Sequence, residues 1–269
     1  MNKESVVAKK KFGQNFLKDE TVLRKIIQAM PKNDHKIVEI GPGLGDLTKY
    51  LVDVKSVEAF EVDTDLCKLL QSRFKKEIDT ERLHINCGDV LNAWQSSLVD
   101  ESYDLVANLP YYIATNIILK ALADPMCKNI LVMVQLEVAE KFCASAGEKV
   151  FGSLGIITQS VGKSHIVVRV PPTAFEPKPK IDSAVFLIQK DRDRSDKEFE
   201  DMLRVAFTQP RKTLMKNLSQ KYEKALLQEA YKELDFAQTI RPHQVITQDY
   251  HQLYNIIKGS LDGRRESED

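Results

Sequence analysis

The sequence predicts an α/β domain with a mostly parallel sheet, followed by a small all-helical domain. Short β-rich runs alternate with helical stretches between residues 36 and 136, and a glycine-rich turn follows the first run. Beyond a charged stretch near residue 190, apolar residues recur only at helical spacing. Alternation of this kind is typical of parallel strands joined by crossover helices. A chain of 269 residues, 43% of them hydrophobic, is long enough for both domains.

Five apolar, β-rich runs are expected to be strands, at residues 36–40, 57–62, 83–87, 103–107 and 130–136. Asp63 can cap a helix that runs to Phe74, and Thr115 can cap another that runs to Ala123. Residues 165–170 and 183–188 flank a proline-rich segment that is too short for a crossover helix. We therefore expect these two runs to form an antiparallel addition to the sheet.

The segment KDRDRSDKE after Gln189 carries no apolar residue and is interpreted as a linker. It predicts two domains, residues 1–190 and residues 191–269. Neither a signal peptide nor an apolar run of membrane-spanning length is seen, so we expect a cytoplasmic protein with no membrane partner. The four cysteines form no Cys-x-x-Cys pair, and we expect them to be reduced and to bind no zinc.

The formal net charge is zero, which by itself disfavours a nucleic-acid partner. The distribution of charge changes that view, because residues 1–25 hold 7 basic and 3 acidic groups and residues 163–224 hold 14 and 9. Positive charge thus collects in the N-terminal arm and after residue 163. Such clusters are more often solvated faces than binding sites, so charge alone does not establish RNA binding.

The first predicted strand runs into Gly41-Pro42-Gly43-Leu44-Gly45, and such a turn lets backbone amides approach a nucleotide-like ligand. A phosphate-binding Walker loop would need Gly-Lys-Ser/Thr at its end, which is lacking. A dinucleotide fingerprint would need a glycine where Asp46 stands, and that carboxylate would oppose a pyrophosphate. The run EIGPGLG instead resembles the first motif of the S-adenosylmethionine-dependent methyltransferases, whose ligand carries a sulfonium. Glu39 is compatible with such a cation, although the glycines can also serve chain reversal alone.

Two acids at strand ends extend this site. Glu61 ends the second predicted strand, where a carboxylate can accept both ribose hydroxyl hydrogens. Asp89 follows the third strand and can accept from an adenine amino group. An acid in such a position can instead cap a helix, which is the interpretation we prefer for Asp63.

The fourth predicted strand leads into Asn108-Leu109-Pro110-Tyr111. An exocyclic adenine amine is a weak nucleophile, and acceptors for its two hydrogens favour the pyramidal geometry of attack. The Asn108 side-chain oxygen and the Leu109 carbonyl can provide them, while Pro110 fixes the loop and Tyr111 stacks on the extruded base. This chemistry requires no metal. In isolation Asn-x-Pro-Tyr is also a good turn.

A resemblance to one family covers nearly the whole chain. It rests on KKFGQNFLKD, EIGPGLGDLT, NLPYYIAT, MVQLEVAEKFCA, FGSLGIITQ, VPPTAFEPKPKIDSAV, PRKTLMKNL and IRPHQV, in this order. The sequence thereby resembles the KsgA ribosomal RNA adenine dimethyltransferases. The resemblance implies a Rossmann-like seven-stranded methyltransferase sheet flanked by helices, followed by a helical RNA-recognition domain.

The resemblance also implies site residues. Cofactor-binding positions would be Asn15, Leu17, Gly41, Glu61, Asp89 and Asn108. Phe175 would line the target-base pocket together with Tyr111. The implied activity converts two adjacent adenines near the 3′ end of small-subunit ribosomal RNA to dimethyladenine, in an assembling subunit, with S-adenosylhomocysteine as the product. We expect a monomer.

The chain departs from the family at several positions. The family usually has Asn where Tyr112 stands, Lys where Leu136 stands, Arg where Pro210 stands and Pro where Lys178 stands. None of these changes removes an atom assigned to chemistry. Tyr112 is the departure to watch, because a larger side chain beside the pocket can alter base positioning or the second methylation.

The basic residues give a candidate RNA-binding surface. Arg211, Lys212 and Lys216 are predicted on one face of a helical segment, and a phosphate track would add Lys178, Lys180 and residues 9–11. Two alternative functions are a large-subunit ribosomal RNA methyltransferase of the resistance type and a non-catalytic RNA-binding assembly factor. The second predicts decay of the glycine loop or of Asn108, and neither is seen.

Overall fold

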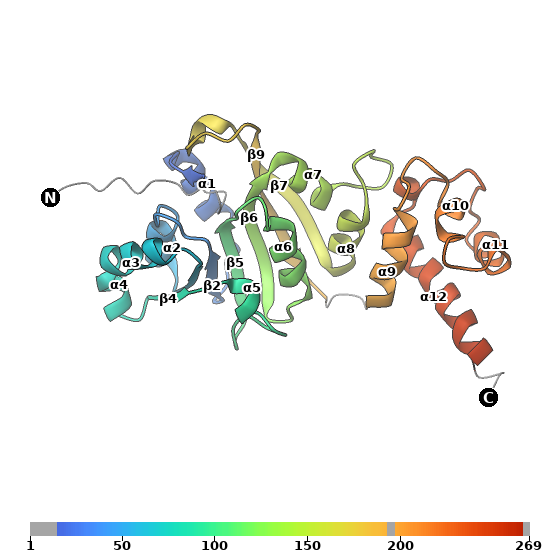
Figure 1. The fold of residues 1–269 in the computed structure, drawn as a ribbon, viewed down its shortest axis with the longest axis horizontal. Helices are drawn as coiled ribbons and strands as arrows, with labels where there is room; N and C mark the ends of the chain where they lie inside the picture. Colours follow the sequence, from blue (N-terminus) through green and yellow to red (C-terminus); the bar gives the residue numbers. More distant parts are fainter. Residues whose placement is uncertain (1–14, 193–196, 266–269) are drawn as a thin grey trace. The chain divides into compact units, whose positions relative to one another are not determined.

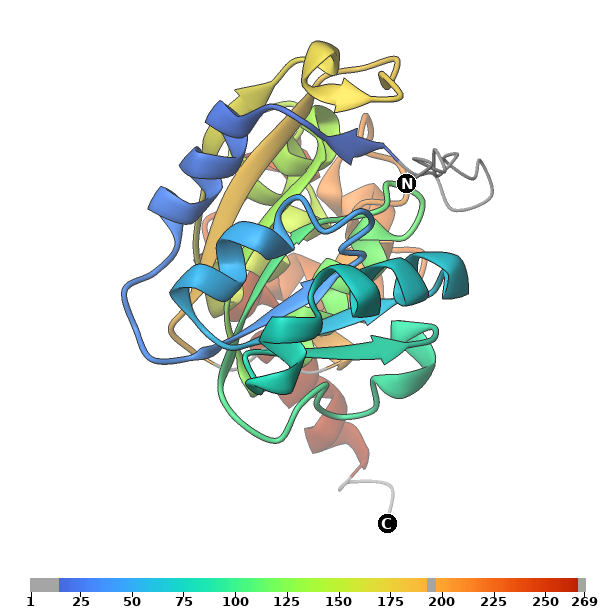
Figure 2. The same cartoon turned by 90° about the vertical axis from the view of Figure 1, so that its left-hand side faces the viewer.

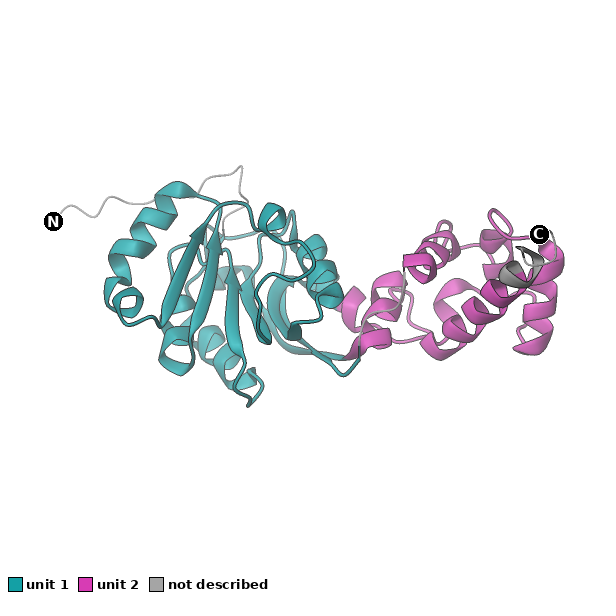
Figure 3. Cartoon of the chain, turned by 90° about the horizontal axis from the view of Figure 1, so that it is seen from below, with its two compact units in different colours: residues 1–139, 163–193 teal, residues 140–162, 194–269 magenta. Residues whose placement is uncertain are grey.

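The computed structural model describes residues 15–192 and 197–265. The chain divides into two compact units, drawn in two colours in Figure 3. The first comprises Met1–Ala139 and Lys163–Asp193, and the second Glu140–Gly162 and Arg194–Asp269. Residues 140–162 are predicted in the first domain, but helix α8 (Ser153–Val161) packs against α9 (Lys197–Ala206) and α12 (Thr247–Arg265). The second unit therefore takes up a segment from the middle of the chain.

A seven-stranded sheet forms the first unit, and helices flank it (Figure 1). Its order is β4-β3-β2-β5-β6-β9-β7, and the four pairs between β4 and β6 are parallel. The bounds are β2 (Lys36–Ile40), β3 (Val57–Glu61), β4 (Leu83–Cys87), β5 (Tyr103–Asn108), β6 (Cys127–Gln135), β7 (Gly162–Val170) and β9 (Ser183–Lys190). Strand β9 runs antiparallel to β6 and lies between β6 and β7. The Rossmann-like sheet implied by the sequence is confirmed.

Most predicted strand bounds agree with the structure, and the exceptions lie at strand ends. Strands β2 and β4 have the predicted limits, since their apolar runs are short and sharply bounded. Strand β3 stops at Glu61, which leaves Val62 outside the ladder. Strand β6 begins at Cys127 and ends at Gln135, because Leu136 already opens helix α7 (Leu136–Cys143).

Helix α1 (Glu20–Ala29) precedes the seven-stranded sheet, and the helices between its parallel strands are α2 (Thr48–Val54), α3 (Thr64–Arg73), α4 (Lys75–Asp79), α5 (Val90–Ala93) and α6 (Ala114–Ala123). The predicted cap of α3 is confirmed, because the Asp63 side chain accepts the Asp65 amide at 3.0 Å. The predicted cap at Thr115 is wrong. Helix α6 starts at Ala114, and its N-cap is Ile113 without a side-chain hydrogen bond. A turn closed by the Ile113 amide on the Pro110 carbonyl leads directly into the helix.

A second, two-stranded sheet was not predicted. Strand β1 (Phe16–Leu17) pairs antiparallel with β8 (Phe175–Glu176), and the Lys18 amide donates to the Ala174 carbonyl at 2.8 Å. Strand β8 follows the 3-10 turn η2 (Pro172–Ala174) in the proline-rich segment. Figure 2 shows β1 beside this segment. The start of the described chain is thereby fixed to the loop between β7 and β9.

The expectation of four reduced cysteines is wrong for one pair. Cys67 and Cys87 form a disulfide, with their Cα atoms 6.1 Å apart. Helix α3 packs on β4 and brings residues 20 apart in sequence within bonding distance. Cys127 and Cys143 are not joined by a disulfide, in agreement with the prediction.

The second unit is helical in the described residues, as predicted from its apolar spacing. Besides α8, α9 and α12 it contains α10 (Leu214–Leu218), α11 (Lys224–Glu233) and the 3-10 turn η3 (Pro242–Gln244). Phe199, Leu203, Leu227 and Tyr250 are fully buried in its core. Within residues 15–192 and 197–265, no helix combines the length and the apolar character needed to cross a membrane.

Candidate active site

The centre of the sheet holds a switch point, because β2 is hydrogen-bonded to β3 on one side and to β5 on the other. Ligands of such folds bind at the carboxyl ends of the strands beside this point. The loop after β2 turns sharply there, and Gly43 and Gly45 adopt φ values of +61° and +81°. A Cβ atom at Gly45 would overlap the Phe74 ring, so the glycine is needed for packing as well as for conformation.

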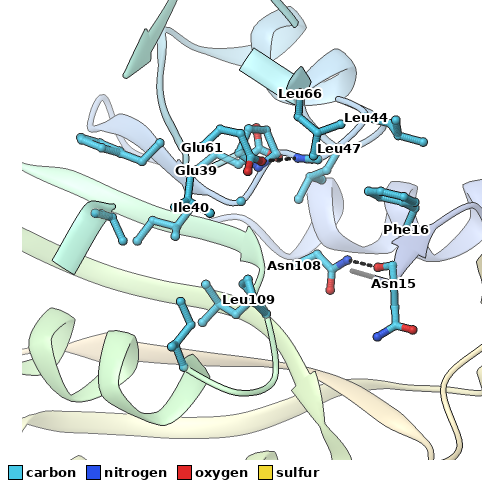
Figure 4. A pocket seen from close by; sticks show the side chains of 18 of the residues that line it. Asn15, Phe16, Glu39, Ile40, Leu44, Leu47, Glu61, Leu66, Asn108 and Leu109 are labelled. Atoms are coloured by element: carbon cyan, nitrogen blue, oxygen red, sulfur yellow. Dashed lines mark hydrogen bonds between the residues drawn. The ribbon is translucent and has the colours of Figure 1, made fainter. Parts of the chain in front are cut away.

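One pocket opens at this point and gathers the residues predicted for cofactor and chemistry (Figure 4). Its lining includes Asn15, Leu17, Gly41, Glu61, Asp89, Asn108, Leu109, Pro110 and Tyr111. Phe16, Glu39, Val62, Leu66 and Tyr112 also line it. The sheet thus brings together all the predicted cofactor positions and the whole predicted catalytic turn.

Glu61 joins the glycine loop to the end of β3. It is 4% exposed, and its two carboxylate oxygens accept backbone amides, from Gly43 at 3.1 Å and from Asp63 at 2.9 Å. Burial raises the pKa of Glu61, and these hydrogen bonds oppose the rise. A carboxylate has about four acceptor positions, so Glu61 keeps capacity for ribose hydroxyls.

Glu39 is a second buried acid of the pocket, 1% exposed. The Thr48 hydroxyl donates to its Oε2 atom at 2.7 Å. Burial raises the pKa of Glu39 to about 8, the charge of Glu61 adds to the rise, and the Thr48 hydrogen bond opposes it. A cation in the pocket would stabilise the charged form of Glu39, whereas a phosphate would not.

Asp89 serves as a helix cap in addition to lining the pocket. It is the N-cap of α5, and its Oδ1 atom accepts the Leu91 amide at 2.9 Å. Asp89 is exposed to solvent, whereas Glu61 is buried. The cap bond fixes the carboxylate, and its second oxygen is the atom suited to an adenine amine.

The end of β5 places Asn108 in the pocket. Its Nδ2 atom donates to the Asn15 carbonyl at 3.1 Å, so its Oδ1 atom points away from Asn15 (Figure 4). The amide is thereby oriented with the oxygen available as an acceptor. This is the orientation that catalysis by acceptor groups requires.

The arm before α1 closes one side of the pocket through contacts that sequence reasoning missed. Lys18 forms an ion pair with Asp46 at 2.6 Å, and Phe16 lies against the glycine loop, where a Cβ at Gly43 would be 3.0 Å from its ring. Phe16 sits between the two arm residues that the family resemblance singled out. The presence of an aromatic residue between Asn15 and Leu17 is the sequence feature that could have predicted this contact with the glycine loop.

Two predicted base-pocket residues lie in different surroundings. The Tyr111 hydroxyl is 2.7 Å from the Ser183 hydroxyl at the start of β9, and Tyr111 lines the pocket. Phe175 is 3% exposed, lies opposite Leu17 in the β1·β8 pair and belongs to the core, not to the lining of this pocket. Its role at the target base stays a prediction.

The predicted RNA-binding residues are all exposed, namely Lys178, Lys180, Arg211, Lys212 and Lys216. The prediction that the last three share a helix is wrong for two of them. Arg211 and Lys212 lie in the turn before α10, because the helix begins at Leu214 with Thr213 as its cap, and Lys216 alone is helical. Lys9 to Lys11 lie outside the described residues.

A pocket lined by carboxylates, at the switch point of a Rossmann-like sheet, suits a cationic nucleoside and defines the class of the protein as an α/β methyltransferase. The family model described as ribosomal RNA adenine dimethylase matches residues 6–259. The chain belongs to this family, which confirms the resemblance seen in the sequence.

Two relatives span nearly the same length. Ribosomal RNA small subunit methyltransferase A of Sulfurimonas denitrificans is 79% identical over 263 residues, covering 98% of this chain and 98% of the relative. The protein of the same name from Aliarcobacter butzleri is 52% identical, covering 95% of this chain and 98% of its own. These relatives favour the small-subunit group over the resistance group.

Solved structures share the fold. A dimethyladenosine transferase from Plasmodium falciparum has a TM-score of 0.74 at 24% identity, covering 88% of this chain and 95% of its own. The 23S rRNA methyltransferase ErmE has a TM-score of 0.70 at 24% identity, covering 91% and 100%. At this identity the likeness shows the fold alone.

Proposed function

We propose that the protein transfers methyl groups from S-adenosylmethionine to the exocyclic amines of two adjacent adenines near the 3′ end of small-subunit ribosomal RNA, making each dimethyladenine. The single observation that carries this is the shared pocket, in which the nucleoside-binding acids Glu61 and Asp89 and the acceptor Asn108 line the same space. Family membership and the names of the relatives support the choice of RNA.

The donor set of the pocket fits S-adenosylmethionine. Glu61 and Asp89 are suited to the ribose hydroxyls and the adenine amine. Glu39 can become charged when a cation lies beside it, and the described residues that line the pocket include no Lys or Arg to bind a phosphate. When bound, this cofactor would supply a methyl group on a positively charged sulfur. Each transfer would leave the neutral sulfur of S-adenosylhomocysteine, and the amine would release one proton to solvent. The buried carboxylates favour the cation over the neutral product.

The turn after β5 would hold the target amine. The Asn108 oxygen and the Leu109 carbonyl accept its two hydrogens and so favour a pyramidal nitrogen, whose lone pair is directed at an electrophile. Pro110 fixes the turn, which the Ile113 amide closes by donating to the Pro110 carbonyl at 3.2 Å. Tyr111, anchored on Ser183, offers a ring on which an extruded adenine can stack. No step in this scheme requires a metal.

The second unit is proposed to recognise RNA. Arg211, Lys212 and Lys216 are exposed there and can contact phosphates, while Lys178 and Lys180 are exposed in the first unit. We further propose that the protein acts as a monomer, in the cytoplasm, on an assembling small subunit.

Methyl incorporation from labelled S-adenosylmethionine tests this function. Unmethylated small and large ribosomal subunits are incubated separately with the full chain, and label is counted in each RNA. We expect label in the small-subunit RNA, in adenines alone. Label confined to large-subunit RNA would show that the substrate is assigned wrongly, and label in neither would remove the proposed activity.

A further inference from the structure

Two neighbouring tyrosines, Tyr111 and Tyr112, follow Pro110, and both line the pocket. Strand β5 lies at the centre, with β6 and β9 on one side and β2, β3 and β4 on the other. The Tyr111 hydroxyl reaches Ser183 of β9. Tyr112 shares the pocket lining with Glu61 at the end of β3 and Asp89 after β4. Burial raises the pKa of Tyr112, and the charges of Asp89 and Glu61 add to the rise.

The Tyr112 side chain is exposed to solvent at the edge of the pocket, where a bound ligand could cover it. It is 58% exposed although it lines the pocket. Six large apolar or aromatic side chains stay exposed among the described residues, and two of them, Tyr112 and Val62, line this pocket. Because both side chains line the pocket, they give a ligand bound there an apolar surface to cover.

We propose that Tyr112 is a cofactor-binding residue whose ring covers the nucleoside end of the ligand, on the side of Glu61 and Asp89. This rests on the proposed function, since it takes S-adenosylmethionine as the ligand. Tyr111 then serves the target base and Tyr112 the cofactor. Tyr112 in place of the family's usual Asn then changes the affinity for the cofactor nucleoside, whereas base positioning and the second methylation depend on other residues.

The aromatic ring accounts for the expected effect. Stacking of a base on an aromatic ring strengthens binding about 5- to 150-fold, and a ring that stays partly exposed belongs at the lower end of that range. We therefore expect Tyr112→Asn to weaken binding roughly tenfold. Tyr112→Phe keeps the ring, so its affinity should stay within about twofold of wild type if the ring acts by stacking.

Calorimetric titration of the full chain with S-adenosylhomocysteine measures this directly and does not depend on turnover. The matched control is Val54→Asn, an equally polar change at a side chain that is 50% exposed and does not line the pocket. Its affinity should equal that of wild type. Thermal unfolding of each variant verifies folding, which an exposed position should preserve.

The kinetic readout separates the two sides of the site. For Tyr112→Asn we expect KM for S-adenosylmethionine to rise about tenfold, with KM for the RNA and the ratio of mono- to dimethyladenine unchanged. Equal affinity of Tyr112→Asn and wild type would overturn the proposal, as would a change in RNA KM or methyl ratio alone. Absence of binding by wild type would instead contradict the cofactor assignment on which both proposals rest.

Discussion

The buried carboxyl group of Glu39 makes the stability of the ligand-free protein depend on pH. Its pKa is raised from 4.5 to about 8, chiefly by burial. A folded-state pKa above the unfolded value means that the folded state holds the proton more tightly. The stabilisation is complete below pH 4.5 and is lost as the pH rises through about 8.

The size of this effect follows from the two pKa values. Each unit of difference corresponds to about 1.4 kcal/mol, so the free energy of unfolding should fall by roughly 4 kcal/mol between pH 4.5 and pH 8 through Glu39 alone. Glu39→Gln removes the titration and keeps an oxygen that can accept the Thr48 hydroxyl. The stability of the variant relative to wild type should therefore rise by that amount across the interval.

Urea unfolding of both proteins at half-unit pH steps, without cofactor, gives this difference. Taking the difference cancels the groups that do not interact with Glu39; Glu61 does interact with it, and its pKa is raised in the same direction. A difference that stays constant from pH 5 to pH 8 would refute the reasoning, because it would mean that Glu39 has an ordinary pKa. The effect should shrink when S-adenosylmethionine is present, since a cation stabilises the charged carboxylate.

Three other changes test separate parts of the site. Asn108→Ala should lower methyl transfer about 100-fold or more and leave binding to the small subunit unchanged, as measured by incorporation of label and by sedimentation with subunits. Gly43→Ala should weaken S-adenosylhomocysteine binding, measured by calorimetry, because its φ is +61° and its Cβ would press on Phe16. Replacing Arg211 and Lys212 together by Ala should weaken RNA binding and reduce its salt slope by about 2.

Each of these changes has its own control or contradiction. Retained methylation by Asn108→Ala would exclude the amide as an essential acceptor. If Gly43→Ala binds S-adenosylhomocysteine as tightly as wild type, the Phe16 ring moves away from the new Cβ atom with no loss of affinity. Lys75 and Lys76, an exposed pair on α4, supply the matched double substitution for the RNA experiment. If replacing Lys75 and Lys76 by Ala alters the salt slope as much as replacing Arg211 and Lys212 does, RNA binding depends on the net charge of the protein and not on the proposed surface.

The sequence predicted the parts of the fold that depend on local pattern. Strands β2 and β4 are short apolar runs with polar ends, and the Asp63 cap has a side chain that bonds its own helix. Thr115 failed as a cap because the turn after Pro110 sets the start of α6, and a capping residue type alone does not reveal that turn.

The features that sequence could not predict depend on contacts between distant residues. Strands β1 and β8 have two residues each, too few to show a periodicity, and they pair Phe16 with Glu176 across most of the chain. The pairing of Cys67 with Cys87 requires the packing of α3 on β4. The contact of Tyr111 with Ser183 of β9 likewise depends on strand order, which the local sequence does not show.

Mass analysis of the target RNA tests the central claim most directly, because it reports the base and the number of methyl groups together. Small-subunit RNA from unmethylated subunits is digested after incubation with the protein and S-adenosylmethionine. The account predicts two neighbouring adenines near the 3′ end, each with two methyl groups on its amine. Methylation of another base, or of a ring nitrogen of adenine, would contradict the geometry assigned to Asn108 and Leu109.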